Sequence, residues 1–294
     1  MSLHYLNPRN DIAFKKIFGD DKNKDILIHF LNDVLNKTGS EAIKEVLLTN
    51  PQLLPEIEGL KESILDVLCT DQKGNQYIVE MQVSGSKGFA KRAQYYAAKA
   101  YSNQAQKGDA YHLLKEVIFL AILDFTMFPE KLAYKSDHVI LDKDNHAHHL
   151  KDFSFTFIEL PKFTKENPEE LNSYEEKWCY FLKHANDPAY MQRFLTSIGN
   201  ENSIIKKAYD VLEAHHWTAE ELQRYERMEK INKDMRAREE FIIDEAETRG
   251  EARGEARGEA RAKKNIAEKL KQAGLDDQQI AAATGLTLEE LRLC

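Results

Sequence analysis

The chain has 294 residues, of which 42% are hydrophobic and 31% are charged, so it is long enough for one large domain or two smaller ones with a substantial core. Its formal net charge of −8 argues against bulk electrostatic binding to nucleic acid or to an anionic membrane, but is compatible with a local basic groove. Widely spaced cysteines, an N-terminus without an apolar signal core and no apolar run of membrane-spanning length predict a cytoplasmic protein that does not enter a membrane.

The chain up to residue 50 predicts two helices followed by a strand. Apolar residues recur at helical spacing over residues 12–18 and again over residues 26–35, and a Gly-Asp-Asp stretch separates the two. Residues 43–48 form a short apolar run that suits a first strand.

A β-hairpin is predicted over residues 63–83, where two strand-like runs flank the polar turn Asp-Gln-Lys-Gly-Asn. If that turn is the loop, Thr70 pairs with Gln76, and counting back places Asp66 opposite Glu80. Side chains directly opposite each other in an antiparallel pair have Cβ atoms roughly 4.5–5.5 Å apart. The sequence therefore predicts two neighbouring carboxylates on one face of the hairpin.

Two interpretations of this carboxylate pair are open. Adjacent carboxylates among apolar neighbours repel each other and resist desolvation, and a hard divalent cation between Asp66 and Glu80 would remove both penalties. Gln82 follows Glu80 by two residues and so shares its face of the strand. The alternative is a half-exposed face on which the carboxylates only keep the sheet soluble, and a loop longer or shorter by one residue would break their opposition.

The next elements complete a sheet. A turn at residues 85–88 leads into a helix over residues 89–107, which is rich in alanine and tyrosine. The continuous apolar run 117–123 suits a strand buried on both faces, and alternating phenylalanines predict a further strand over residues 153–160. A hairpin joined through one helix to another strand is a βαβ-type crossover, so the predicted fold class is α/β.

Helical patterns dominate the chain from about residue 168 to residue 247, and the repeat Gly-Glu-Ala-Arg follows at residues 250–262. On a helix the Glu and Arg stripes of this repeat lie on nearly opposite sides and cannot pair with each other. Its glycines also cost roughly 1 kcal/mol each relative to alanine. The repeat is therefore either a solvated linker or a helical stalk in which the stripes of two copies pair, which would make a homo-oligomer through the C-terminal helices.

These patterns predict four regions: a core over residues 1–165, a helical region over 166–247 that completes the core or packs on it, a linker or stalk over 248–262, and a small helical tail over 263–294. The tail superficially resembles a helix-turn-helix but has no basic recognition helix, so we interpret it as a packing or oligomerisation unit. The histidines at 146–149 are interpreted as a polar loop rather than as zinc ligands, and those at 215–216 as a helix end.

Several blocks occur in a fixed order around the carboxylates, and the set is more specific than the carboxylate motif alone. The chain resembles the PD-(D/E)XK nuclease superfamily and, more closely, the bacterial Rpn family of recombination-promoting nucleases and transposases, over about residues 8–245. The blocks are residues 10–18, 79–83, 91–96 and 158–163, reading NDIAFKKIF, VEMQV, KRAQYY and IELPKF.

The resemblance implies a PD-(D/E)XK restriction-endonuclease-like fold with an αβββαβ core and a helical C-terminal extension. It also implies hydrolysis of DNA phosphodiesters, with DNA as the partner and Mg²⁺ (or Mn²⁺) as the cofactor. The implied catalytic residues are Asp66, Glu80 and Gln82; the implied metal ligands are Asp66, Glu80, the Met81 carbonyl and Asp11; the implied substrate contacts are Lys91, Arg92, Tyr95 and Tyr96. For Asp11 the alternative is a favourable charge at a helix N-terminus, and for the tyrosines it is core packing.

Gln82 departs from the superfamily pattern, which has a lysine at this position. A lysine would orient or deprotonate the attacking water and offset transition-state charge, whereas glutamine supplies no charge. The candidates for the missing charge are Lys15, Lys87, Lys91 and Arg92. Two alternatives to a DNA endonuclease stay open. One is a degenerate nuclease fold that binds nucleic acid or protein without cleaving, and the other is an oligomerising helical module on a sheet scaffold.

Overall fold

The structure is a computed structural model that describes residues 5–50, 52–53, 63–105, 108–198 and 203–292. Backbone contacts divide the chain into two units, Met1–Asn232 and Lys233–Cys294. Cys69 and Cys179 are buried free thiols, and Cys294 lies outside the described residues.

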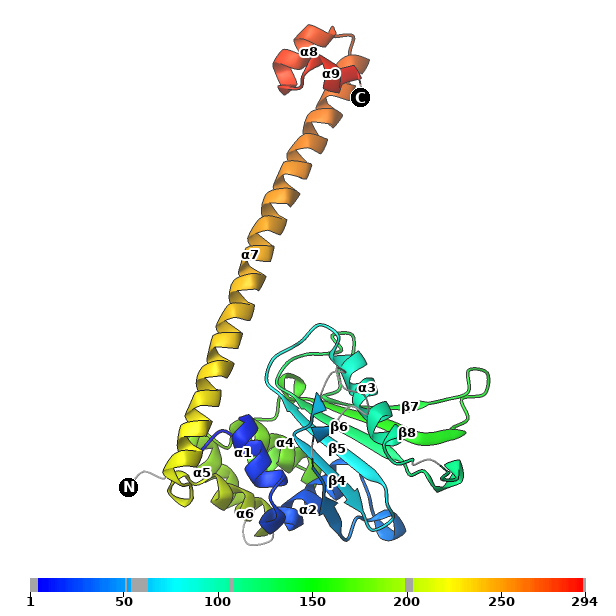
Figure 1. Ribbon diagram of the computed structural model, residues 1–294. Coiled ribbons are helices and arrows are strands. Elements are labelled where there is room, and N and C mark those ends of the chain that lie inside the picture. The colour runs from blue at the N-terminus through cyan, green and yellow to red at the C-terminus, as the bar shows by residue number, and fades with distance from the viewer. Residues whose placement is uncertain (1–4, 51, 54–62, 106–107, 199–202, 293–294) are drawn as a thin grey trace. The chain divides into compact units, whose positions relative to one another are not determined.

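The first unit is built on a six-stranded sheet with the strand order β1-β4-β5-β6-β8-β7 (Figure 1). β5, β6 and β8 run parallel to one another, whereas β1, β4 and β7 pair antiparallel with their neighbours. A second, two-stranded sheet pairs β2 with β3. The strands are β1 Val46–Leu48, β2 Gln52–Leu53, β3 Ser63–Ile64, β4 Val67–Asp71, β5 Gln76–Gln82, β6 Val117–Leu123, β7 Lys135–Ile140 and β8 Leu150–Glu159.

The helices confirm the predicted α/β class. Two helices precede β1, β4 and β5, and α3 then connects β5 to β6, which gives the αβββαβ order. The helices are α1 Asp11–Phe18, α2 Lys24–Val34, α3 Phe89–Ser102, α4 Tyr174–His184, α5 Pro188–Ser197, α6 Ser203–Leu212, α7 Ala219–Gln272, α8 Asp277–Thr284 and α9 Leu288–Arg292.

Alternation along the strands sends side chains to two apolar cores, one on each face of the sheet. Tyr77 and Met81 of β5 face a core shared with α1, α2 and the helices from α4 to α6. Ile78 of β5 faces the other core, which α3 covers (Figure 1). Because Glu80 and Gln82 follow Ile78 in steps of two residues, they lie on the α3 face.

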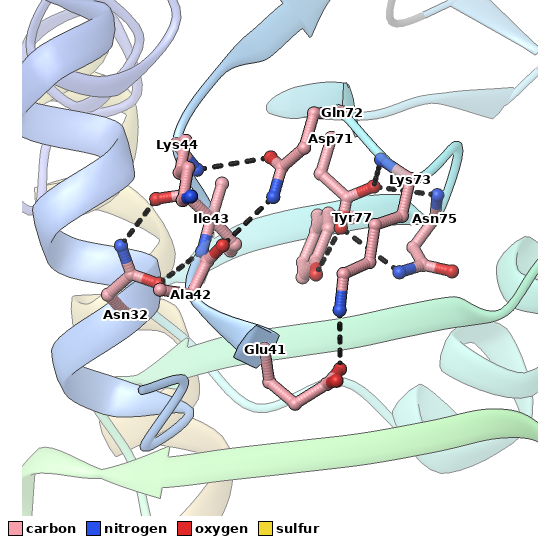
Figure 2. A network of polar contacts seen from close by, with 10 residues as sticks. All are labelled: Asn32, Glu41, Ala42, Ile43, Lys44, Asp71, Gln72, Lys73, Asn75 and Tyr77. Atoms are coloured by element: carbon pink, nitrogen blue, oxygen red, sulfur yellow. Dashed lines mark hydrogen bonds and ion pairs between the residues drawn. The ribbon is translucent and has the colours of Figure 1, made fainter. Parts of the chain in front are cut away.

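The turn between β4 and β5 is held by the side chain of Asp71, which is buried (Figure 2). Its carboxylate accepts hydrogen bonds from the backbone N–H groups of Lys73 and Asn75, at 2.8 and 2.9 Å. It also accepts from the Asn75 amide and from the Tyr77 hydroxyl, both at 3.0 Å. These bonds close one particular loop length, and loop length determines the register of a hairpin.

The observed register runs from Thr70 opposite Gln76 to Val67 opposite Val79, as the turn predicts. The strand predicted over residues 63–70 is nevertheless interrupted. β3 ends at Ile64 and pairs with β2, and β4 begins only at Val67.

Two other strands differ from the sequence-based prediction. β7 was not predicted, because its sequence KSDHVI has no clear alternation and forms a short strand at the sheet edge beside β8. β1 is shorter than predicted, because Asn32 of α2 exchanges two hydrogen bonds of 2.8 Å with the backbone of Ile43. β6, by contrast, is buried along its whole length, as predicted.

The helix α7 extends over 54 residues and contains the whole Gly-Glu-Ala-Arg repeat. Glu245 pairs with Arg249 immediately before the repeat, and Glu259 in its last unit pairs with Lys263 immediately after it, both at 2.7 Å. Opposite charges within the repeat are never three or four residues apart, so they cannot pair along one helix. In the second unit the end of α7 packs with α8 and α9 around Ile280. Within the described residues, no helix is long and apolar enough to cross a membrane.

Candidate metal centre

Asp66 and Glu80 meet where the β4–β5 ladder ends. The backbone N–H of Asp66 donates to Glu80 Oε1 at 3.3 Å, and the N–H of Met81 donates to Asp66 Oδ2 at 2.9 Å. Side chains thus replace the next rung of the ladder, which explains why β4 begins only at Val67. Both carboxylates are largely buried, with 3% of Glu80 and 11% of the Asp66 side chain exposed.

The two carboxyl groups resist ionisation. Burial raises the pKa of Asp66, and the nearby carboxyl of Asp11 raises it further. Burial also raises the pKa of Glu80, and the charge on Asp66 adds to this effect. The pair is therefore unfavourable in its ionised form unless positive charge is supplied close by.

Helix α1 supplies such a charge through Lys15. The Asn10 side chain caps the helix by accepting the N–H of Ile12 at 3.0 Å, and Asp11 and Lys15 then lie one turn apart on the same face. Lys15 Nζ lies 3.0 Å from Asp11 Oδ1 and 3.2 Å from Asp66 Oδ1. Burial lowers the pKa of Lys15, but the two carboxylates more than offset this and the net shift is upward. Lys15 is thus held as a cation.

The opposite side of α1 is fastened to the first turns of α7. The Asn10 amide donates to Glu229 Oε1 at 2.9 Å and to the Tyr225 carbonyl at 3.2 Å. Lys16 pairs with Glu221 at 2.6 Å. The block NDIAFKKIF therefore has two roles: Asn10 and Lys16 position the helix, while Asp11 and Lys15 face the carboxylate pair.

Gln82 connects Glu80 to helix α3. Its Nε2 donates to Glu80 Oε2 at 3.0 Å, and its Oε1 accepts from the Arg92 guanidinium at 2.5 Å. The guanidinium also lies over the ring of Phe89, 4.8 Å from the centroid. Within the described residues, Arg92 Nε is buried without a hydrogen-bond partner. Arg92 thus places a positive charge beside Gln82, the residue at the lysine position of the superfamily. Its Nε–H group has no hydrogen-bond acceptor among the described residues.

The other predicted residues of α3 differ in their distance from the pair. Burial raises the pKa of Tyr96, Arg92 opposes this shift and Glu80 reinforces it, so the Tyr96 hydroxyl lies within electrostatic reach of the site. Tyr95 is 47% exposed and packs beside Tyr96, with ring centroids 6.2 Å apart. Lys91 is exposed. The described residues show no hydrogen bond or ion pair from Tyr95 or Lys91 to the carboxylates.

The structure reduces the four candidates for the positive charge that Gln82 does not supply to two. Of the four candidates, Lys15 and Arg92 reach the site, whereas Lys87 and Lys91 are exposed. The spacing of Asp11 and Lys15 was a signal that both lie on one helix face. Which face of α1 meets the hairpin depends on how the helix packs, and spacing does not report that.

The donor set fits a hard divalent cation. Asp66, Glu80 and Asp11 offer carboxylate oxygens, the ligands that Mg²⁺ and Mn²⁺ prefer. The Lys15 ammonium contacts two of these carboxylates, so the surroundings already accommodate a positive charge.

The chain matches the model of a protein family described as PD-(D/E)XK nuclease family transposase, over residues 8–240. Neither the curated proteins nor the solved structures with which it was compared include a match. The matched residues contain α1, the six-stranded sheet and α3, and therefore all the side chains of the candidate metal centre. The chain thus belongs to the PD-(D/E)XK nuclease family transposases, in agreement with the resemblance drawn from its sequence.

Proposed function

We propose that this protein is a divalent-metal-dependent DNA endonuclease that acts in the cytoplasm in recombination or transposition-like events. The observation that supports this most strongly is the buried Asp66–Glu80 pair, in which burial raises the pKa of both carboxyl groups and the charge on Asp66 raises that of Glu80 further. Perturbed, paired carboxylates of this kind are characteristic of functional sites. A hairpin under selection for stability alone would carry apolar residues at these two positions.

In this proposal Asp66, Glu80 and Asp11 hold Mg²⁺ or Mn²⁺, with the Met81 carbonyl as a further oxygen ligand. When bound, such an ion would supply Lewis-acid polarisation of the scissile phosphate and of the attacking water. Gln82 orients that water by hydrogen bonding.

The basic and aromatic side chains around the carboxylates bind the DNA backbone. Lys15 and the free N–H of Arg92 offset the charge that develops on the phosphate. Tyr96 contacts the same phosphate, and the exposed Lys91 and Tyr95 contact neighbouring ones, where an exposed ammonium attracts DNA without positioning the reacting group.

The direct test is nicking of supercoiled plasmid by the purified protein. Cleavage is expected with Mg²⁺ or Mn²⁺ and none in excess chelator. A calorimetric titration with Mn²⁺, repeated on Glu80→Ala, separates this function from a degenerate nuclease fold. DNA binding without cleavage, together with Mn²⁺ heats that are absent or unchanged in Glu80→Ala, would favour the binding module instead.

Replacing Lys15 with alanine is expected to lower the cleavage rate at saturating DNA by about 100-fold, the effect of removing one preorganised electrostatic contact to the transition state. The metal concentration for half-maximal cleavage should not rise, because Lys15 competes with the metal for Asp66 and Asp11. Lys91→Ala is the matched control, and it should mainly weaken DNA binding. A Lys15→Ala enzyme with the wild-type rate would transfer this role to Arg92, which Arg92→Ala then tests.

We also propose that α7 joins two copies of the chain. Phe241, Ile242 and Ile243 are 65%, 55% and 51% exposed, and the Glu and Arg stripes of the repeat can pair between helices although not within one. A Cβ on any of the repeat glycines would meet nothing within 4 Å, so close approach of a second helix is open there.

The variant with alanine at Gly250, Gly254 and Gly258 tests this association. It should stabilise the isolated helix by roughly 1 kcal/mol per site, yet shift sedimentation from dimer toward monomer, because the added methyl groups hold the helices apart. A wild-type protein that sediments as a monomer at every concentration would rule the dimer out.

A further inference from the structure

Glu213, His215 and His216 come together in the turn between α6 and α7. One ligand atom from each lies within 4.8 Å of the others. The turn is a 3₁₀ helix, Ala214–His216, and it brings the two histidine rings to a centroid distance of 3.9 Å. His215 Nδ1 lies 3.2 Å from Glu213 Oε2, and His216 Nδ1 lies 4.0 Å from the same oxygen.

Two of these side chains are oriented by further hydrogen bonds. The hydroxyl of Tyr5 donates to Glu213 Oε1 at 2.9 Å, which leaves Oε2 directed at the histidines. His216 Nδ1 lies 2.8 Å from the carbonyl of Asp210, a contact that requires the proton on Nδ1 and leaves the lone pair on Nε2. Metal-ligating histidines and carboxylates usually have such outer partners, which hold the ring tautomer and the carboxylate in place.

We infer that this turn binds Zn²⁺ through Glu213, His215 and His216. Two imidazoles and one carboxylate form a common three-ligand zinc set that leaves a fourth position for water. The histidines are accessible, since 63% of the His215 side chain and 50% of the His216 side chain are exposed. His216 also borders a cavity of about 390 Å³.

This site and the Asp66–Glu80 site select different metals. Imidazole ligands favour Zn²⁺ and its transition-metal neighbours, whereas the all-carboxylate site favours Mg²⁺ and Mn²⁺. The zinc site therefore does not rest on the proposed nuclease function. The helix-end interpretation of His215 and His216 agrees with the observed turn, but the sequence did not indicate that Glu213 folds back onto them.

The position of the site indicates what the metal would stabilise. Tyr5 forms an isolated β-bridge with Glu213, and the N–H of Leu6 donates to the Leu212 carbonyl at 3.0 Å. Directly after the turn, α7 begins with the residues that hold α1. A zinc ion here would fix the turn between the end of α6 and the start of α7, which the N-terminal segment contacts through Tyr5, and would thereby support the helix that carries Asp11 and Lys15.

Cobalt substitution gives a readout that is independent of cleavage. The full-length protein, prepared without a histidine tag, is titrated with Co²⁺ in the presence of saturating Mg²⁺, which occupies the carboxylate site. The expected result is a visible absorption band of tetrahedral type that saturates at one equivalent and disappears when Zn²⁺ is added. Absence of any band in the wild-type protein would overturn the proposal.

Variants then identify the residues that bind the Co²⁺ ion responsible for the band. His215→Ala/His216→Ala should abolish it, and Tyr5→Phe should weaken Zn²⁺ binding by about 10-fold, the lower end of the usual effect of an outer-shell partner. His148→Ala/His149→Ala is the matched control, because it removes a pair of adjacent histidines elsewhere in the chain, and it should keep the band. A band that survives in His215→Ala/His216→Ala, or that is lost in the control, would assign the metal to another place and refute the site.

Discussion

The Asp66→Asn variant is expected to lose metal-dependent DNA cleavage by about 10³-fold, because the metal and the transition state would then face one buried charge fewer. The substitution preserves shape, since an amide oxygen can still accept the N–H of Met81, as Asp66 Oδ2 does at 2.9 Å. Asp152→Asn makes the same chemical change on β8, where the exposed carboxylate accepts the Tyr101 hydroxyl at 2.6 Å. This control should cleave at the wild-type rate.

The same variant should be more stable than the wild type when metal is absent. The pKa of Asp66 is raised in the folded protein, so its contribution to stability is fully present below the ordinary carboxyl pKa of about 4 and is lost as the pH rises through the folded value. The advantage of Asp66→Asn should therefore be small in acid and largest above neutral pH.

Thermal unfolding in chelator measures the stability of the metal-free proteins, and thermal unfolding in Mg²⁺ measures how far the metal stabilises each of them. Mg²⁺ should raise the melting temperature of the wild type, because it binds the folded state, but not that of Asp66→Asn. Equal stabilisation of both proteins by Mg²⁺, together with unimpaired cleavage by the variant, would remove Asp66 from the metal centre and with it the proposed mechanism.

The Glu159→Ala variant is expected to be destabilised by roughly 3–5 kcal/mol, the usual effect of leaving a buried charge without its partner. Glu159 is fully buried and pairs with Lys162 at 2.7 Å. Its other oxygen accepts the N–H groups of Met127 and Phe128, at 2.6 and 3.0 Å. These contacts explain why the block IELPKF contains a glutamate and a lysine. Glu159 and Lys162 hold the loop that follows β6 against the end of β8.

Urea unfolding followed by tryptophan fluorescence gives the free energy of unfolding. Glu41→Ala is the matched control, because its ion pair with Lys73 is exposed and such pairs contribute at most about 1 kcal/mol. Glu159→Gln/Lys162→Met, which removes both charges and retains most of the volume, should be less destabilised than Glu159→Ala. A Glu159→Ala protein as stable as the Glu41 control would contradict the assignment of this pair as structural.

That Asp66 and Glu80 meet beyond the last paired residues of the hairpin could be predicted from the sequence because the cause is local. The turn closes through the Asp71 carboxylate and the residues directly after it, and the two-residue period of a strand then determines which side chains face each other. The buried strand β6 and the apolar faces of α1 and α2 were predictable for the same reason, since each pattern lies within one element.

Other features depend on contacts between distant residues, and the sequence did not reveal them. Lys15 reaches Asp66 because Asn10 and Lys16 fix α1 against α7, more than 200 positions away in the chain. The Glu213 carboxylate is held beside His215 by the hydroxyl of Tyr5, which lies 208 positions away in the chain. The hairpin by itself therefore determined where two carboxylates meet. The tertiary structure decided which cation stands beside them, because that depends on the packing of a helix far away in sequence.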